Sequence, residues 1–377
     1  MTSIRLPLPP RFATDCLMGL LFHLDRAYTL TVYGSEVEIS GPRPKLALEE
    51  VLGKKAAQVL DDRAEKGVRV DLRLSGNDKK YRDEIWRAIS LPQDATPLEM
   101  IKTLASDPLK DYGKVRLPSV LKPEYYEYNR VPGYAGSESA RLARDEYPIN
   151  VVAMSLAGYL LSRVGAARLE RNQWVSVVVT PVITASGLAI DPNYRFSVYV
   201  DPVGRLAKDL LQGKGWLDGL FPETALALLL ACTMGGVQFK LYAVKEAGGQ
   251  EPATIFSAMQ MDLRPLYERM RELQLTDERN RQKIIGIAKS SLDVNAQGLE
   301  KTLATRFALL LYEVLSRARP PEEFVSVVNR EYLSIKLFRG GARSEDNKRA
   351  HKIQQLVESA VRVSKKIWSS LMQAEAI

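Results

Sequence analysis

Histidine and cysteine are scarce in this sequence, with only two of each among 377 residues. His23 lies in an apolar segment and His351 in a basic one, and neither has a companion at the spacing of metal ligands. A zinc site needs a cluster of such ligands, which two isolated histidines do not supply. Ser-His-Asp or Cys-His catalysis needs a nucleophile motif near a histidine, and neither histidine has a recognisable one. Cys16 and Cys232 stand far apart in apolar runs, so we expect two buried thiols rather than a disulfide framework.

Long apolar runs and phosphate-binding loops are also missing. The longest apolar stretches, residues 149–161 and 225–234, are well short of the ~20 residues that span a bilayer. The glycine-lysine runs at Gly53 and Gly213 lack the upstream glycine and the following Ser or Thr of a Walker A loop. We therefore expect a cytoplasmic protein without membrane contact, without a cofactor and without catalytic activity.

One catalytic alternative stays open, a metal-dependent nuclease or other DNA-processing enzyme built on acidic residues. Asp-x-Lys triplets begin at Asp78 and at Asp346, and carboxylates of this kind can hold divalent cations. Both triplets fall where a helix is expected to start, so we interpret them as solvated surface.

Positive charge is concentrated near the end of the chain. The formal net charge is +8, of which residues 261–377 contribute +6 through 21 basic and 15 acidic residues. Within residues 336–366, nine basic residues face three acids. A basic excess in one segment is the electrostatic signature of contact with a phosphate backbone.

The order of secondary-structure signals predicts an α+β protein of two domains. Residues 1–260 form a mixed α/β N-terminal domain with antiparallel strands, and residues 261–377, where only helical periodicity occurs, form an all-helical C-terminal bundle. The helices expected in the first domain are residues 14–26, 44–66, Asp78–Ser90, Thr96–Ser106, Asn150–Glu170 and Glu223–Met234. The strands expected there are Thr29–Tyr33, Glu36–Ser40, Val68–Leu74, Trp174–Thr184, Arg195–Val200, Val237–Val244 and Thr254–Met259.

A long loop rich in tyrosine and proline interrupts this pattern over residues 107–148. Between residues 114 and 122 it carries three cations and no acid, and closely spaced tyrosines follow. Aromatic rings stack on unpaired bases while cations contact phosphates, so we predict a nucleic-acid contact. The alternative is that the tyrosines pin the loop to its domain. The candidate residues in this loop are Lys114, Arg116, Lys122, Tyr125, Tyr126, Tyr128 and Arg130.

The last predicted helix has two chemically different sides. At about 100° per residue, its apolar side chains between Ile353 and Leu371 form one stripe, and its cations lie opposite. Glu358 is the sole acid between Lys348 and Ile367, so i,i+4 pairing cannot explain the basic side. A solvated helix face is the alternative to phosphate binding. The predicted phosphate contacts are Lys348, Lys352, Arg362, Lys365 and Lys366, together with Arg339 and Arg343 just upstream.

Residues 117–128, Leu-Pro-Ser-Val-Leu-Lys-Pro-Glu-Tyr-Tyr-Glu-Tyr, resemble the large subunit of the archaeal type I-A CRISPR surveillance complex (Cascade). Chain length, the mixed N-terminal part and the helical C-terminal part resemble it as well. The resemblance implies a non-catalytic subunit that reads a short motif beside the target in duplex DNA. It also implies guide RNA, target DNA, other subunits of the complex and a recruited helicase–nuclease as partners. The resemblance assigns no motif-reading residue in this chain.

A scaffold protein is the third interpretation of the same features. In that case the basic terminal helix docks on an acidic partner protein. A scaffold of this kind would show no salt-dependent affinity for nucleic acid. That difference separates the scaffold interpretation from the nucleic-acid-binding subunit and from the nuclease.

Overall fold

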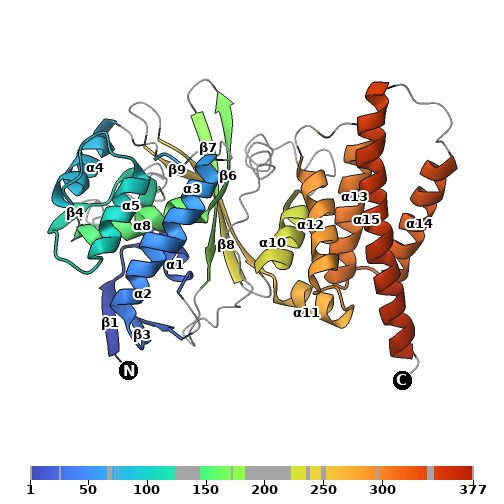
Figure 1. Cartoon of the computed structure of the whole chain (residues 1–377), viewed down its shortest axis with the longest axis horizontal. Coiled ribbons are helices and arrows are strands. Elements are labelled where there is room, and N and C mark those ends of the chain that lie inside the picture. The colour runs from blue at the N-terminus through green and yellow to red at the C-terminus, as the bar shows by residue number, and fades with distance from the viewer. Residues whose placement is uncertain are drawn as a thin grey trace, which may run out of the picture. The chain divides into compact units, whose positions relative to one another are not determined.

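The structure is a computed structural model (Figure 1), and it describes residues 2–24, 27–65, 70–72, 74, 76–123, 145–170, 173–182, 222–234, 238–247, 252–293, 296, 298–337 and 344–375. The chain divides into two compact units, residues 1–207 with 239–260, and residues 208–238 with 261–377. Strands and helices alternate in the first unit and helices build the second, so the fold is α+β, as the sequence predicted. Residues 208–238, which the sequence division assigned to the first domain, belong to the helical unit.

Three antiparallel strands begin the first unit: β1 (Thr2–Pro7), β2 (Thr29–Tyr33) and β3 (Glu36–Gly41), in the order β1-β3-β2. The predicted hairpin of β2 and β3 is confirmed. Its turn contains Gly34 at φ +55°, a conformation that costs glycine little. Helix α1 (Arg11–Leu21) follows β1 and is buried along most of its length.

The helices that follow agree with the predicted ones. They are α2 (Pro44–Glu50), the π-helical segment η1 (Val51–Ala56), α3 (Ala57–Glu65), α4 (Gly76–Ala88) and α5 (Pro97–Ser106). Helix α5 begins at Thr96, whose side chain accepts the N–H of Glu99 at 3.2 Å, while the Glu99 carboxylate accepts the N–H of Thr96 at 2.6 Å. This capping box satisfies two backbone donors that a helix start otherwise leaves unpaired.

The strand predicted over Val68–Leu74 is wrong for its described residues, 70–72 and 74, which form no strand. The carbonyl oxygen of Asp71 instead accepts a hydrogen bond from Nη1 of Arg163 at 3.1 Å. A buried side chain therefore satisfies a backbone group that a neighbouring strand would otherwise have paired.

Helix α8 (Ile149–Ser162) is buried over its whole length and ends at Ser162, not at the predicted Glu170. Arg63 caps its last turn, because Nη1 and Nη2 donate to the carbonyl oxygens of Leu160 and Leu161 at 2.8 and 3.1 Å. From Arg163 the chain continues as a strand. Apolar periodicity alone does not distinguish a buried helix from the buried strand that follows it.

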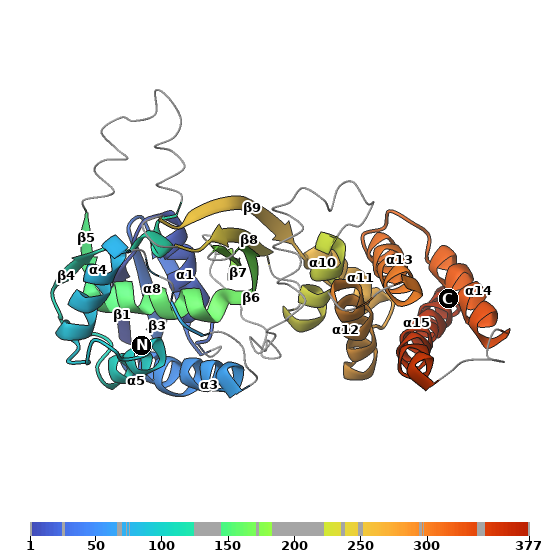
Figure 2. The ribbon, with the colours of Figure 1, turned by 90° about the horizontal axis from the view of Figure 1, so that it is seen from above.

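A four-stranded sheet lies against α1 and α8. Its strands β6 (Arg163–Glu170), β7 (Gln173–Pro181), β8 (Gln238–Lys245) and β9 (Thr254–Asp262) neighbour one another in that order, and β6-β7 and β7-β8 are antiparallel. Both α1 and α8 contact β7, and Figure 2 shows the two helices beside the sheet. The predicted strand Arg195–Val200 lies outside the described residues.

Helices α1 and α8 cross at very short range. A Cβ atom built on Gly158 would overlap the backbone carbonyl of Cys16, and one built on Gly19 would overlap the hydroxyl of Ser162. Glycine at these two positions therefore sets the distance between the helices. Cys16 is fully buried here, and Cys232 is buried in the helical unit, where burial raises the pKa of its thiol to about 12.

The helical unit consists of α10 (Pro222–Met234), α11 (Arg264–Glu272), α12 (Glu278–Leu292), α13 (Gly298–Leu315), α14 (Pro321–Leu337) and α15 (Ser344–Glu375). Helix α15 packs against α12, α13 and α14, and α10 packs against α11, α12 and α13 (Figure 1). Among the helices that the structure describes, none has the length and apolar character needed to cross a membrane.

Candidate nucleic-acid interface

Helix α15 separates apolar and basic side chains as the sequence predicted. Leu356, Val357, Ala360 and Ile367 are buried against the neighbouring helices, and Val363 is buried with them. The helix therefore depends on its apolar stripe for attachment, because burial of such side chains dominates helix packing. Substitution of the outward cations leaves this stripe intact.

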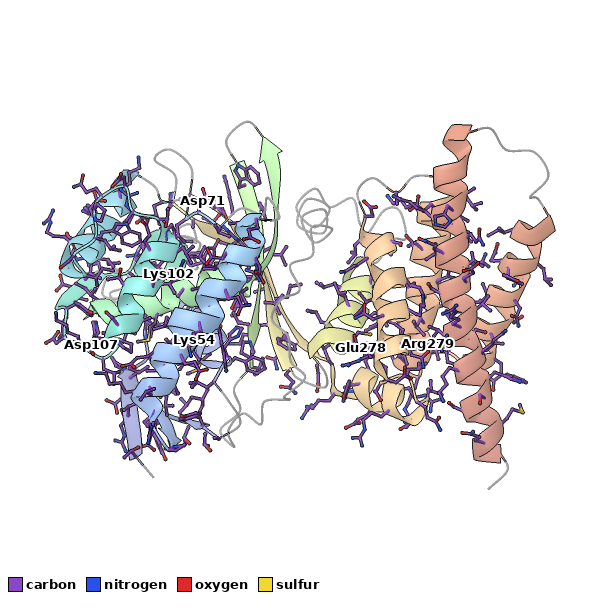
Figure 3. All side chains as sticks on the ribbon, in the orientation of Figure 1. Lys54, Asp71, Lys102, Asp107, Glu278 and Arg279 are labelled. Atoms are coloured by element: carbon purple, nitrogen blue, oxygen red, sulfur yellow. The ribbon has the colours of Figure 1, made fainter. Side chains whose placement is uncertain are left out.

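Two of the predicted cations, Lys352 and Lys366, face the rest of the helical unit. Nζ of Lys352 lies 4.0 Å from the carboxylate of Asp293 and 3.9 Å from that of Glu300. Nζ of Lys366 donates to Oε1 of Gln274 at 2.6 Å. The lysines are fourteen residues apart, so at 3.6 residues per turn they lie on nearly the same side of α15. This side faces the two ends of α12, whose first residues, Glu278 and Arg279, are labelled in Figure 3.

Arg362 and Lys365 point elsewhere. Both are exposed, and neither has an ion-pair or hydrogen-bond partner within the described part of the chain. Arg362 and Lys365 thus have the charge and the accessibility that a phosphate contact requires. The side chain of Lys348 and the whole of Arg339 and Arg343 lie outside what the structure describes.

The tyrosine-rich loop is described only at its two ends. Strands β4 (Lys114–Arg116) and β5 (Glu146–Pro148) pair with each other there. Lys114 is exposed, and Nε of Arg116 lies 3.9 Å from the carboxylate of Glu146.

Among the other candidate residues of this loop, the structure describes Lys122. Lys122 is only 7% exposed, so its ammonium group lies within the domain rather than on the surface that Lys114 occupies. Tyr125, Tyr126, Tyr128 and Arg130 lie outside the described residues.

Of the two acidic residues considered for metal-dependent catalysis, the structure describes the side chain of Asp78. Asp78, expected on the surface, is 2% exposed and accepts a hydrogen bond from the buried hydroxyl of Ser119. The side chain of Asp346 lies outside the described set. Within the described residues, no group of three or more His, Cys, Asp or Glu side chains could hold a metal ion.

The two histidines have different surroundings. Desolvation by burial, followed by the positive charges of Lys55 and Arg63, lowers the pKa of His23 to about 3, so this imidazole is neutral near pH 7. His351 is exposed on α15, where Nε2 lies 2.8 Å from the amide nitrogen of Gln355.

Trp368, an exposed aromatic residue next to the predicted cations, was not singled out by the sequence analysis. Trp368 on α15 is 44% exposed, although tryptophan is mostly buried in folded proteins. A signal was present in the sequence, because Trp368 directly follows the basic pair Lys365-Lys366 and the buried Ile367. At about 100° per residue, Trp368 lies at the boundary between the cations and the aliphatic stripe of α15.

A comparison with protein families finds a match over most of the chain. The family model described as "CRISPR-associated protein, CsaX" matches residues 42–332 of the 377. The match extends over both compact units and stops within α14, before α15 begins. No curated protein matches the sequence.

Proposed function

We propose that this chain, which belongs to the CsaX family of CRISPR-associated proteins, is a non-catalytic, nucleic-acid-binding subunit of an RNA-guided antiviral complex. Membership of the family gives the protein a role in CRISPR defence. In this proposal its own part is to contact target DNA and to help the complex assemble.

The observation that carries the proposal is the pair of exposed cations Arg362 and Lys365 on α15, which have no ion-pair or hydrogen-bond partner among the described residues. Between Glu358 and Glu375 the helix contains Arg362, Lys365 and Lys366 and no acid. A row of cations without compensating carboxylates attracts polyanions, and contacts to the phosphate backbone need no particular base sequence. Because α15 packs through its apolar stripe, these cations can bind a ligand without disturbing the core.

The finer parts of the proposal rest on the resemblance to the large subunit of the archaeal type I-A surveillance complex. They are a location in the cytoplasm and contacts with guide RNA, target DNA, the other subunits and a recruited helicase–nuclease. The buried position of Asp78 gives no support to the competing nuclease.

A salt titration of duplex binding tests the proposal. In the variant Arg362→Gln/Lys365→Gln, the slope of log affinity against log salt should flatten by ~1–2 units, since each phosphate contact contributes about −0.9. Its matched control is Lys289→Gln/Arg330→Gln, which removes two other exposed cations of the same unit from α12 and α14 and should keep the slope. An unchanged slope in the folded test variant would refute phosphate binding by α15 and favour the protein-docking scaffold.

A second assay addresses catalysis. The full chain is incubated with labelled DNA and with Mg²⁺ or Mn²⁺, and no cleavage is expected. Cleavage that disappears on substitution of a single Asp or Glu would instead establish the metal-dependent nuclease.

A further inference from the structure

Trp368 and Met372 form an exposed apolar patch on the last turns of α15. Their exposed fractions are 44% and 42%, and the four-residue spacing places them on the same side of the helix. Trp86, in the first unit, is by contrast 1% exposed. A half-exposed indole beside a second exposed apolar side chain leaves apolar surface that a flat ligand could cover.

Cations lie next to this patch. Lys365 precedes Trp368 by three residues, which places the two side chains about 60° apart around the helix and one turn apart along it. Arg362 lies one turn further towards the start of the helix. Neither Arg362 nor Lys365 has a partner in the described part of the chain, so the indole ring and two available cations occupy neighbouring positions on one helix.

An aromatic ring next to phosphate-binding cations distinguishes single strands from duplexes. In a duplex, both faces of each base are covered by neighbouring bases, so a side chain outside the helix gains nothing from stacking. An unpaired base has a free face, and stacking on an aromatic ring strengthens single-strand binding whatever the base sequence. The segment between Glu358 and Glu375 contains no acid, so its cations attract either a polyanion or an acidic protein surface. Of these two ligands, a nucleic acid also carries the flat apolar groups that stack on an indole ring.

We propose that Trp368, Lys365 and Arg362 bind an unpaired stretch of nucleic acid, with a base stacked on the indole ring and phosphates held by the two cations. This inference rests on the proposed function and narrows it, because it names single-stranded nucleic acid as the preferred ligand of α15. Met372 then lies against the sugar or base that follows along the helix.

The test compares one labelled 20-nucleotide oligothymidylate with a labelled 20-base-pair duplex, both bound to the full chain. Trp368→Leu keeps an apolar side chain but removes the ring, and should weaken single-strand binding about 5- to 150-fold. Duplex binding should change less than about twofold. The matched variant Trp368→Phe retains a ring and should retain most of the single-strand affinity. Arg362→Gln/Lys365→Gln should weaken both ligands, because it removes phosphate contacts.

A crosslinking measurement separates stacking from a structural effect. An oligothymidylate carrying one 5-iodouracil should crosslink to the peptide of α15 that contains Trp368, and the crosslink should disappear in Trp368→Leu while the thermal unfolding midpoint is maintained. Loss of the melting transition in Trp368→Leu together with wild-type affinity and crosslinking in Trp368→Phe would still support the inference.

Three other outcomes would overturn it. Equal weakening of single-strand and duplex binding in Trp368→Leu would show that Trp368 contributes no preference for single strands. Unchanged affinity for both, with concentration-dependent self-association lost in Trp368→Leu, would assign the patch to a second copy of the chain. Failure of the wild-type chain to bind either ligand would refute the proposed function itself.

Discussion

Nζ of Lys366 donates a hydrogen bond of 2.6 Å to Oε1 of Gln274, in the connection between α11 and α12. Gln274 in turn donates to Oε1 of Gln373 at 3.1 Å. Ser370 reinforces this contact, because its hydroxyl donates to the carbonyl oxygen of Leu273 at 2.9 Å. The basic side of α15 thus includes a cation that attaches the helix to its own unit, beside cations that are available to a ligand.

Lys366 and Arg362 should therefore respond differently to substitution. Lys366→Ala should lower the free energy of unfolding by about 0.5 kcal/mol, a small value because the bond is partly exposed. Arg362→Ala should leave the urea midpoint unchanged. Its effect should be confined to DNA binding, where the loss of a phosphate contact reduces the dependence of the affinity on salt. Urea titration of both variants, with DNA binding measured in parallel, checks this. Identical midpoints for the two variants would show that the Gln274 contact contributes nothing.

Gly158 and Gly286 offer a matched pair of helical glycines. Gly158→Ala should destabilise the protein by about 3 kcal/mol or more, because the added methyl group overlaps the carbonyl of Cys16 and forces α1 and α8 apart. Gly286→Ala in α12 meets no atom within 4 Å and should stabilise by about 0.5–1 kcal/mol through the higher helix propensity of alanine. Chemical denaturation measures both changes, and a Gly158→Ala variant as stable as the wild type would contradict the close helix crossing.

The ion pair of Arg163 and Glu246 is almost completely buried, at 3.2 Å, with exposed side-chain fractions of 3% and 2%. Ser176 and Tyr159 also donate to the same carboxylate oxygen, Oε1, at 2.5 and 3.5 Å. Glu246→Leu should cost about 3–5 kcal/mol, because it removes a carboxylate that compensates the charge of the buried Arg163 guanidinium.

The double variant Glu246→Leu/Arg163→Met should lose less stability than the two single variants added together. A double-mutant cycle by urea unfolding gives the coupling free energy. Strict additivity would show that the two side chains do not interact in the folded protein.

The low pKa of the buried His23 should make the folded protein less stable in mild acid. Its pKa is about 3 in the folded protein and close to 6.5 in the unfolded chain. At pH 5 the unfolded chain therefore binds a proton that the folded protein does not, and stability falls as pH falls below 6.5. Between pH 7 and 5 the loss should be about 1–2 kcal/mol.

The variant His23→Gln should lose that part of the pH dependence, measured as the difference between urea midpoints at pH 7 and pH 5. His351→Gln is the matched control, because His351 is exposed on α15, and it should retain the wild-type difference. Retention of the full difference in His23→Gln would place the acid sensitivity on other groups.

Local signals in the sequence determined much of this fold. The alternation of side chains around Gly34 specified a hairpin, Thr96 and Pro97 marked the start of α5, and the 3.6-residue period after residue 262 specified a helical unit. The amphipathic pattern of α15 likewise placed its apolar stripe and its cations on opposite sides. Each of these features depends on residues close together in the chain, so the sequence alone carries the information.

Contacts between distant residues were decided by the tertiary structure. Arg63 caps the end of α8 by donating to carbonyl oxygens nearly a hundred positions away in the chain. Arg163 donates to the carbonyl oxygen of Asp71, in a segment that the sequence predicted as a strand. Lys352 and Lys366 are chemically equivalent to Lys365 in the sequence. Two acids and an amide elsewhere in the unit contact the first two, whereas no described residue forms an ion pair or hydrogen bond with the side chain of the third. The amino-acid sequence establishes which residues carry charge. Packing establishes which of those charges remain available to a ligand, because pairing depends on which groups the fold brings within about 4 Å.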